Sequence, residues 1–413
     1  MNELHIAFGA DNAPAVRELF SRHPDLRTLV NAPIGPFNSP AVCNVRSAQM
    51  LDVLLEAGAD INAKSQWWAG GFCLLDSASD DLAAHAIKRG ATVEIHAAAR
   101  LGLIPRLKEL LAADRRLATA RGGDGKTPLH FARTTQVAAL LLEHGSDVNA
   151  RDIDHESTAS QHLILEHPEV SRFLIEGGGE SDIFLAAALG DLALVRQHIA
   201  ANADCLRRRI NSESFPMRNP KAGGTIYNWT LGWHLSPQQV ARKFGHEQVF
   251  NFLMVQSPPE VQLANWCWLG EEEEARKTLA QNPGVIAKLT GTDRRAMADA
   301  ARNNETPAVL LMLDCGFPID ARGQHSATPL HWAAWHGNAA MLKRLLDHGA
   351  ASLLQTRDKD FDGTPMRWAV HGSENGWNCA QGDYGTVVKA LLAAGAKRPE
   401  KVEGSPAVRE ALS

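Results

Sequence analysis

The sequence predicts an all-α solenoid, a linear stack of about twelve helix-turn-helix units, and three observations indicate this fold class. With 413 residues, the chain exceeds the ~250–300 residues at which one hydrophobic core stops growing. Residues 54–63 and 141–150 are near copies of each other, and related strings recur further along the chain. The copies that begin at Met312 and Leu345 are 33 positions apart, a period typical of stacked helical repeats.

Each unit is predicted to begin with one helix and to close with a second. The first helix starts at Thr-Pro-Leu-His, found at Thr127 and Thr328 and varied at Thr364, because threonine caps a helix and proline suits its first turn. The second helix carries paired leucines and ends on a glycine such as Gly58 or Gly145. Glycine adopts the left-handed conformation that terminates helices, so one unit is a helix, a short turn and a helix.

These strings resemble the ankyrin-repeat family, most specifically at residues 124–150 and 327–350. The resemblance implies that the histidines of Thr-Pro-Leu-His form hydrogen bonds within their turns. It also implies a single ankyrin solenoid over 1–413, with an N-terminal capping unit at 1–38, repeats at 39–396, and a C-terminal cap at 397–413 whose helix covers 406–412. Residues 223–229 and 368–377 further resemble a group of bacterial ankyrin-repeat proteins of unassigned activity.

A second form of the repeat begins with an alanine-rich or tryptophan-rich string at 97–102, 186–191 and 264–270, with a degenerate copy at 8–11. After the second helix, three of these repeats continue into Ala-Asp-Arg-Arg, Asn-Ala-Asp-Cys and Gln-Asn-Pro-Gly instead of the usual closing string. We therefore expect a longer turn in these repeats.

The composition excludes several functional classes. A formal charge of −5 and a pI near 6.4 argue against nucleic-acid binding, which uses clustered lysine and arginine. The one basic cluster, 207–209, is predicted to be a solvated helix end. Six cysteines without a C-x-x-C pair indicate neither a zinc module nor a disulfide framework. Without a signal-peptide pattern or a run of about 18 apolar residues, we expect a cytoplasmic monomer with no cofactor, bound metal or membrane contact.

Three insertions interrupt the period, near 66–71, 211–224 and 372–383. Insertions in repeat proteins lie on one face, which is often the binding face, and large aromatic side chains exposed on such a face indicate interaction. We therefore expect ligand contacts from the insertions, the turn tips and the concave face. The predicted ligand-binding residues are Trp67, Trp68, Asp152, Asp154, Tyr227, Trp229, Trp233, His325, Trp335, Glu374, Trp377 and Asp383. By contrast, Trp332 and Trp368 are predicted to belong to the core between repeats.

Two classes of function remain open from the sequence. The first is a binding protein that recognises a partner protein or peptide through its aromatic-rich and histidine-rich concave face. The alternative is an enzyme or a small-molecule-binding protein. Its acid/base pocket, with or without a metal, would be built by the insertions over the groove, and the acid/base candidates are His155, Glu156, His336 and His371. This pocket can form only if five residues lie within about 15 Å of one another, namely Trp67, His155, Trp229, Trp335 and His371.

Overall fold

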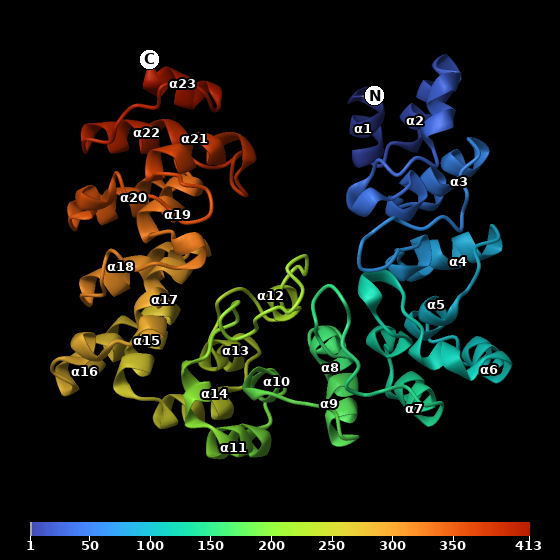
Figure 1. The fold of residues 1–413 in the computed structure, drawn as a ribbon, viewed down its shortest axis with the longest axis horizontal. Coiled ribbons are helices and arrows are strands. Elements are labelled where there is room, and N and C mark those ends of the chain that lie inside the picture. The colour runs from blue at the N-terminus through green and yellow to red at the C-terminus, as the bar shows by residue number, and fades with distance from the viewer. Residues whose placement is uncertain (1) are drawn as a thin grey trace. The chain divides into compact units, whose positions relative to one another are not determined.

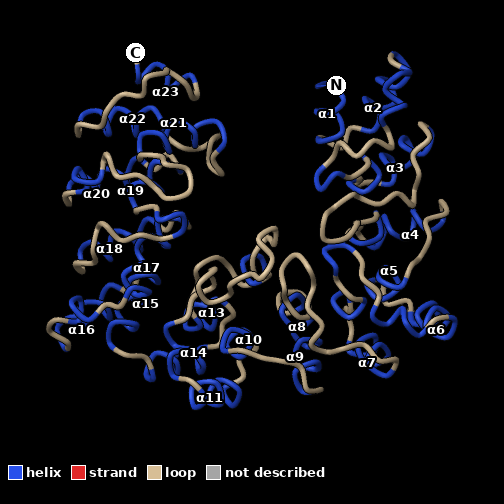
Figure 2. Tube along the Cα trace, in the orientation of Figure 1, coloured by secondary structure: helices blue, strands red, loops and turns tan. Residues whose placement is uncertain are grey.

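The computed structural model describes residues 2–413, and the regular elements of this part of the chain are helices (Figure 1). Helices and loops alternate along the trace, and no described segment forms a strand (Figure 2). The predicted all-α solenoid is therefore confirmed. Over the same residues, none of the helices has the length and apolar character needed to span a membrane.

The contacts between residues divide the chain into two compact units. Unit 1 comprises Met1–Leu185 and Ile210–Gly232, and unit 2 comprises Ala186–Arg209 and Trp233–Ser413. The first boundary falls inside helix α10 (Ile183–Ala188). The second predicted insertion therefore belongs to unit 1, and the single solenoid predicted over 1–413 stays a prediction.

Unit 1 consists of short helices packed in succession around two apolar clusters. Met50 and Leu51 are fully buried in the first cluster, and Leu107 and Leu141 in the second. The α-helices are α1 (Asn2–Gly9), α2 (Ala13–Arg22), α3 (Ala48–Glu56), α4 (Asp80–Lys88), α5 (Ile95–Arg100), α6 (Ile104–Ala113), α7 (Thr135–Glu143), α8 (Ala159–Leu163), α9 (Pro168–Glu176) and α12 (Tyr227–Thr230). The 3-10 helices are η1 (Pro24–Leu29), η2 (Pro36–Asn38), η3 (Ala41–Asn44), η4 (Leu74–Asp76), η5 (Arg115–Thr119), η6 (Gly123–Gly125) and η7 (Pro128–Phe131).

Unit 2 contains one continuous apolar cluster that extends from Leu263 to Leu412. Its α-helices are α11 (Leu192–Ala201), α13 (Pro237–Lys243), α14 (Glu247–Gln256), α15 (Pro259–Leu269), α16 (Glu272–Gln281), α17 (Gly291–Arg302), α18 (Thr306–Asp314), α19 (Pro329–Trp335), α20 (Ala339–Asp347), α21 (Pro365–Asn375), α22 (Tyr384–Ala393) and α23 (Pro406–Leu412). Its 3-10 helices are η8 (Ala203–Arg207), η9 (Val285–Lys288), η10 (Gln324–Ser326) and η11 (Ala350–Leu353). Helix α23 packs on α22 and confirms the closing helix predicted near the C-terminus.

In three repeats of unit 1 the first helix of the predicted pair is a short 3-10 helix and not an α-helix, namely η3, η4 and η7. The number of residues between the starts of the two helices explains the difference. Thr127 and the next N-cap, Thr134, are seven positions apart, whereas Thr328 and Asn338 are ten apart. Three residues are nearly one α-helical turn, so α19 forms after Thr328 while only η7 forms after Thr127.

The longer turns of the second repeat form contain an additional 3-10 helix, namely η1, η5, η8 and η9. Asp114 ends α6, and its side chain accepts a hydrogen bond from the Arg116 amide at the start of η5. Asn202 accepts the equivalent bond from the Asp204 amide in η8. In these two turns, therefore, the side chain that ends the α-helix also caps the following 3-10 helix.

Two local predictions are confirmed. His130 and His331 each accept a hydrogen bond at Nδ1 from the amide of the threonine three residues before, and each donates from Nε2 to a carbonyl of the following repeat. The closing glycines Gly58 and Gly145 have φ of 94°. Because this region is strained for other residues, the glycines are required where the second helices end.

The predicted solvated helix end at 207–209 is wrong. Arg207 forms ion pairs with Glu260 and Asp293. Arg209 is buried, and its guanidinium lies 5.2 Å from the ring of Trp268. This basic cluster is therefore part of the packing of unit 2.

Candidate functional site

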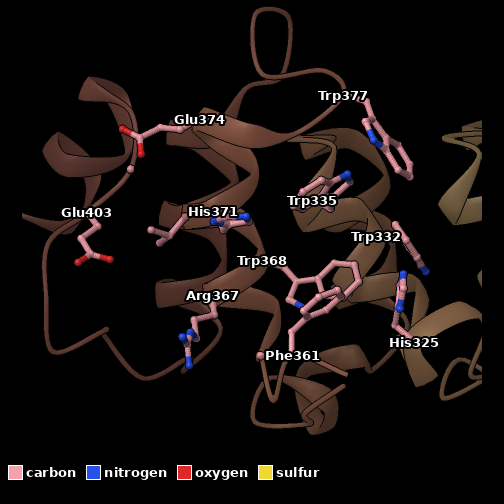
Figure 3. Close-up of a pocket in the computed structure, with 13 residues that line it drawn as sticks. His325, Trp332, Trp335, Phe361, Arg367, Trp368, His371, Glu374, Trp377 and Glu403 are labelled. Atoms are coloured by element: carbon pink, nitrogen blue, oxygen red, sulfur yellow. The ribbon is translucent and has the colours of Figure 1, made fainter. Parts of the chain in front are cut away.

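A pocket in unit 2 is lined by aromatic side chains of α19, α21 and the turn that follows α21. Trp332 and Trp335 share one face of α19, and Trp368 and His371 share one face of α21, because residues three apart are neighbours on a helix. Trp377 completes the wall (Figure 3). The cavity measures about 560 Å³, and its lining also includes His325, Phe361, Arg367, Glu374 and Glu403.

The four tryptophans contact one another in favourable geometries. Trp368 meets Trp332 at 90° with ring centroids 4.9 Å apart, and meets Trp335 at 70° and 5.9 Å. Trp377 is stacked on Trp332 at 20° and 6.0 Å. Edge-to-face and offset-stacked pairs are the arrangements that aromatic quadrupoles favour. Trp332 and Trp368 are buried, as predicted for core residues, but each also lines the pocket.

Helix α21 approaches the backbone of α19 closely beneath Trp335. A Cβ atom on Gly372 would lie 2.6 Å from the Trp335 carbonyl oxygen. The Tyr384 hydroxyl donates a hydrogen bond to the same oxygen over 2.8 Å. Because α21 continues to Asn375, the insertion predicted at 372–383 begins as helix, and only the part from Gly376 onward is a turn. Two residues of the insertion, Glu374 and Trp377, line the pocket.

A hydrogen bond fixes one tryptophan of the pocket wall, and charged side chains line the rim of the pocket. The Trp368 Nε1 atom donates a hydrogen bond to Asp358 over 2.9 Å. Burial alone would raise the pKa of Asp358, but this bond and backbone hydrogen bonds lower it below its usual value. In the view of Figure 3, the carboxylates of Glu374 and Glu403 lie on the opposite side of the pocket from Trp377. The pocket therefore combines an aromatic end with an acidic end.

Trp377 also contacts a buried cation outside the pocket. The Arg302 guanidinium lies 4.6 Å from the ring centroid of Trp377 and 4.1 Å from that of Trp233, and burial lowers the pKa of Arg302 to about 10. His336 donates from Nε2 to the Arg302 carbonyl and accepts at Nδ1 from Asn378. Both nitrogens of His336 are therefore used by the fold, and Trp233 faces Arg302.

A second cluster of predicted residues lies in unit 1. His155 donates from Nδ1 to the Gly224 carbonyl over 2.8 Å. Its Nε2 atom lies 3.6 Å from Asp154 Oδ2 and 4.0 Å from Asp124 Oδ2. The side chains of these three residues are only 10–11% exposed. Burial raises the pKa of Asp154, and the Asp124 carboxylate adds to this rise while His155 opposes it.

The insertion at 211–224 is attached to this cluster. Glu156 Oε1 accepts hydrogen bonds from the amides of Arg218 and Asn219, each over 2.9 Å. The Gly223 amide donates to the Asp154 carbonyl over 2.9 Å. Glu156, predicted as an acid/base candidate, therefore holds the insertion against the tip that carries His155.

Helix α12 contributes one exposed and one buried aromatic residue. Trp229 is 52% exposed, and its ring centroid lies 4.9 Å from that of His155. Tyr227 is fully buried and donates from its hydroxyl to Asp182 over 3.0 Å. Trp229 is accessible to a ligand, whereas Tyr227 supports the helix from within.

The first insertion, at 66–71, lines a smaller cavity of about 210 Å³ with Gly70 and Gly71. Its two tryptophans are half-buried and lie outside this cavity. Trp67 contacts Trp68 and lies edge-on to the exposed ring of Phe37, with centroids 4.9 Å apart in the latter pair. These rings form a separate aromatic surface of unit 1.

Three further predicted residues make local hydrogen bonds. Asp152 accepts bonds from the amides of His155 and Ser157 and shapes the tip between them. Asp383 caps α22. His325 lines the pocket of unit 2 and donates to Asp360 over 2.7 Å.

The structure therefore brings the predicted residues together in two groups. His155 and Trp229 meet in unit 1, and Trp335 and His371 meet in unit 2, with ring centroids 5.9 Å apart in the latter pair. The sequence did not identify Asp124, which lies in a regular tip, or the pocket faces of the two core tryptophans. The available sequence signal for Asp124 was its carboxylate at a turn tip, one repeat before the tip that carries Asp154.

Comparison with known proteins agrees with this architecture. A family model for a single ankyrin repeat matches residues 124–153, and a model for three copies of the ankyrin repeat matches 239–357 and 297–397. The chain is thus a repeat protein built from stacked helix pairs. The matched segments, 124–153 and 239–397, are ankyrin repeats.

This chain covers less than a fifth of the length of each of two sequence relatives. The E3 ubiquitin-protein ligase KEG of Arabidopsis thaliana is 23% identical over 252 residues, which are 57% of this chain and 15% of the ligase. The Protein fem-1 homolog C of Danio rerio is 38% identical over 79 residues, which are 15% of this chain and 13% of that protein. The human ASB11 ankyrin repeat domain aligns with 18% identity over 74% of this chain and 99% of that domain, with a TM-score of 0.27.

Proposed function

We propose that this chain is a binding protein whose unit 2 pocket receives a basic side chain from a partner protein. The observation that carries the proposal is the convergence of four tryptophans on a cavity that ends at two carboxylates, those of Glu374 and Glu403. Ankyrin stacks serve mainly as recognition scaffolds, and a few aromatic residues in a desolvated pocket commonly supply most of the binding energy at an interface.

The chemistry of the lining favours a cation with a long aliphatic stem. A lysine or arginine stem would pack along the indoles, and its charged end would reach the acidic side of the pocket. Cations over indole faces contribute about 0.5–2 kcal/mol. The chain already uses this interaction where Arg302 packs against Trp377 and Trp233. Arg367 also lines the pocket, and Arg409 pairs with Glu374 over 3.3 Å, so an incoming cation competes with Arg409 for this carboxylate.

A free organic cation is the second candidate ligand, since a cavity of about 560 Å³ falls in the range of small-molecule sites. Binding is favoured over acid/base catalysis because two of the four proposed acid/base residues are engaged elsewhere. His336 uses both nitrogens in hydrogen bonds, and Glu156 accepts two backbone amides. His371 lines the pocket, and its ring packs against that of Trp335.

The test is a fluorescence titration of the full chain with short peptides that differ only at one central residue: arginine, lysine or norleucine. We expect quenching of tryptophan emission by the arginine and lysine peptides, with affinity at least ~10-fold above that of the norleucine peptide. Trp377→Leu and the double variant Glu374→Gln, Glu403→Gln should weaken this binding. Trp67→Leu, in unit 1, is the control and should not.

Two results would count against the proposal. Equal binding of the norleucine peptide would show that charge is not recognised. Binding of free guanidinium or alkylammonium ions as tightly as the peptides would assign the pocket to a small organic cation instead of a protein.

A further inference from the structure

The tip that carries Asp124 has a structural equivalent in unit 2. Asp124 and His325 each precede the threonine of Thr-Pro-Leu-His by three residues and have φ of 57° and 60°. The Asp124 carbonyl accepts a hydrogen bond from the Ile153 amide, and the His325 carbonyl accepts one from the Lys359 amide, both over 2.8 Å. Each tip therefore packs on the next tip through the same backbone contact.

The side chains at these equivalent positions differ in charge. In unit 2, His325 donates to Asp360 over 2.7 Å. Counting back from the following threonine, Asp154 of unit 1 occupies the position of Asp360, so Asp124 there faces a second carboxylate. The backbone hydrogen bond between neighbouring tips does not require a carboxylate at either of these positions. Two carboxylates brought together in a largely enclosed place repel each other unless a positive charge joins them.

His155 completes the unit 1 cluster with a free nitrogen. Its Nδ1 atom donates to the Gly224 carbonyl, which leaves the lone pair of the neutral imidazole on Nε2, and Nε2 makes no hydrogen bond with any described residue. The ligand atoms of the two aspartates and His155 all lie within 4.8 Å of one another. The equivalent of His155 in unit 2 is Phe361, which cannot bind a metal.

We propose that Asp124, Asp154 and His155 bind a divalent transition-metal ion, such as Mn²⁺ or Zn²⁺. Such ions bind imidazole nitrogen and carboxylate oxygen at about 2.0–2.2 Å, which places neighbouring ligand atoms roughly 3–4 Å apart. The observed separations of 3.6 and 4.0 Å need only small side-chain rotations. An imidazole ligand favours these ions over Mg²⁺ or Ca²⁺.

The surroundings resemble those of working metal sites. A hydrogen bond from the second imidazole nitrogen to a carbonyl, here that of Gly224, is the usual way to orient a histidine ligand. Three protein ligands leave coordination positions open to water or to a further ligand, and the exposed Trp229 packs against His155 at this point. The open side of the site is thus bordered by an indole.

Lys126 is the competing cation. Its Nζ atom lies 3.0 Å from Asp124 Oδ2, so a metal ion must share this carboxylate with the ammonium group or displace it. Removal of the lysine charge should therefore tighten metal binding.

A neighbouring group of His130, Asp152 and His162 also clusters but is less suited to a metal. His130 uses one ring nitrogen in its turn and the other on the Ser157 carbonyl, and Asp152 accepts two backbone amides. Two of these three side chains therefore already use their polar atoms in hydrogen bonds within the fold.

The test is calorimetric titration of the full chain with MnCl₂ and ZnCl₂ after treatment with a chelator. We expect one site per chain that Asp154→Asn and His155→Gln weaken by more than the ~10–100-fold typical of outer-shell changes. Asp360→Asn, at the equivalent position of unit 2, is the matched control and should bind like the wild type. Lys126→Met should bind more tightly.

A spectroscopic measurement identifies the nitrogen ligand directly. Pulsed electron paramagnetic resonance of bound Mn²⁺ should show coupling to an imidazole nitrogen in the wild type and in Lys126→Met, and none in His155→Gln. No binding of either ion to the wild type would overturn the proposal. Binding that Asp154→Asn leaves unchanged would overturn it as well, since this binding would come from other histidines.

Discussion

The indole of Trp368 stands at 90° to that of Trp332 and is fixed at its other edge by a hydrogen bond from Nε1 to Asp358. One edge of this ring is therefore polar and the rest is apolar. The same residue belongs to the core of unit 2 and to the wall of its pocket. We therefore expect Trp368 to couple the stability of unit 2 to the ligand binding proposed for this pocket.

Trp368→Phe tests this coupling. Phenylalanine keeps the aromatic contact with Trp332 but removes the bond to Asp358, and a hydrogen bond to a charged group is worth about 1.5–3 kcal/mol. We expect the free energy of unfolding to fall by roughly this amount and ligand affinity at the pocket to fall with it. Urea denaturation and fluorescence titration measure the two effects.

Trp377→Phe provides the comparison, because its side chain is 58% exposed and surface substitutions change stability by only about 0.5 kcal/mol. We expect weaker ligand binding with nearly unchanged unfolding. Equal losses of stability in the two variants would contradict the separate roles assigned to these tryptophans.

Two glycines in neighbouring helices of unit 2 should respond oppositely to alanine. In Gly372→Ala, the new Cβ would lie 2.6 Å from the Trp335 carbonyl, and relief of such overpacking costs about 1–3 kcal/mol. In Gly385→Ala, the nearest atom is 3.5 Å away, and the gain in helix propensity is up to about 1 kcal/mol. Thermal unfolding should show a lower Tm for the first variant and an equal or higher Tm for the second.

The sequence predicts the elements whose contacts are local. The Thr-Pro-Leu-His turns and the closing glycines follow from residues within a few positions of one another, and His130 and Gly58 behave as expected. It fails where the spacing between the two caps decides: Thr127 and Thr134 are only seven positions apart, which leaves too few residues for an α-helix between them. Only the structure, through contacts between residues far apart, shows how the chain divides into two units.

The candidate sites are harder to predict because one side chain can serve two purposes. Trp332 has the pattern of a core residue and is buried, yet it also lines the pocket. Asp124 attracts no notice in a regular turn until Asp154 and His155 are found beside it. Tyr227 has the position of an exposed aromatic residue, but it is fully buried, and Phe215 of the insertion packs against its ring.

Glu156 should control the order of the insertion at 211–224. Glu156→Ala removes the acceptor of the Arg218 and Asn219 amides, so we expect faster hydrogen exchange at these amides and faster proteolysis of the segment. Glu156→Gln keeps an oxygen acceptor and should restore most of the protection. Equal protection in wild type and Glu156→Ala would show that other contacts order the insertion.

His331 should make unit 2 sensitive to acid. Burial lowers its folded pKa to about 4, whereas the unfolded pKa is about 6.5. Between these values the unfolded state binds more protons, so stability present above pH 6.5 is lost as the pH falls towards 4, by up to about 3 kcal/mol. Urea denaturation at pH 7.5, 5.5 and 4.5 measures this loss.

His331→Gln isolates the contribution of this residue, because the chain already uses glutamine at the same capping position. Gln161 accepts the Thr158 amide, and Gln239 the Ser236 amide, each over 2.9 Å. The variant loses the bond from His331 to Gly363 and should be less stable at pH 7.5 by about 1 kcal/mol. Glutamine does not titrate, so the gap to wild type should close or reverse by pH 4.5. A gap that stays constant over this range would mean that His331 is protonated equally in the folded and unfolded states.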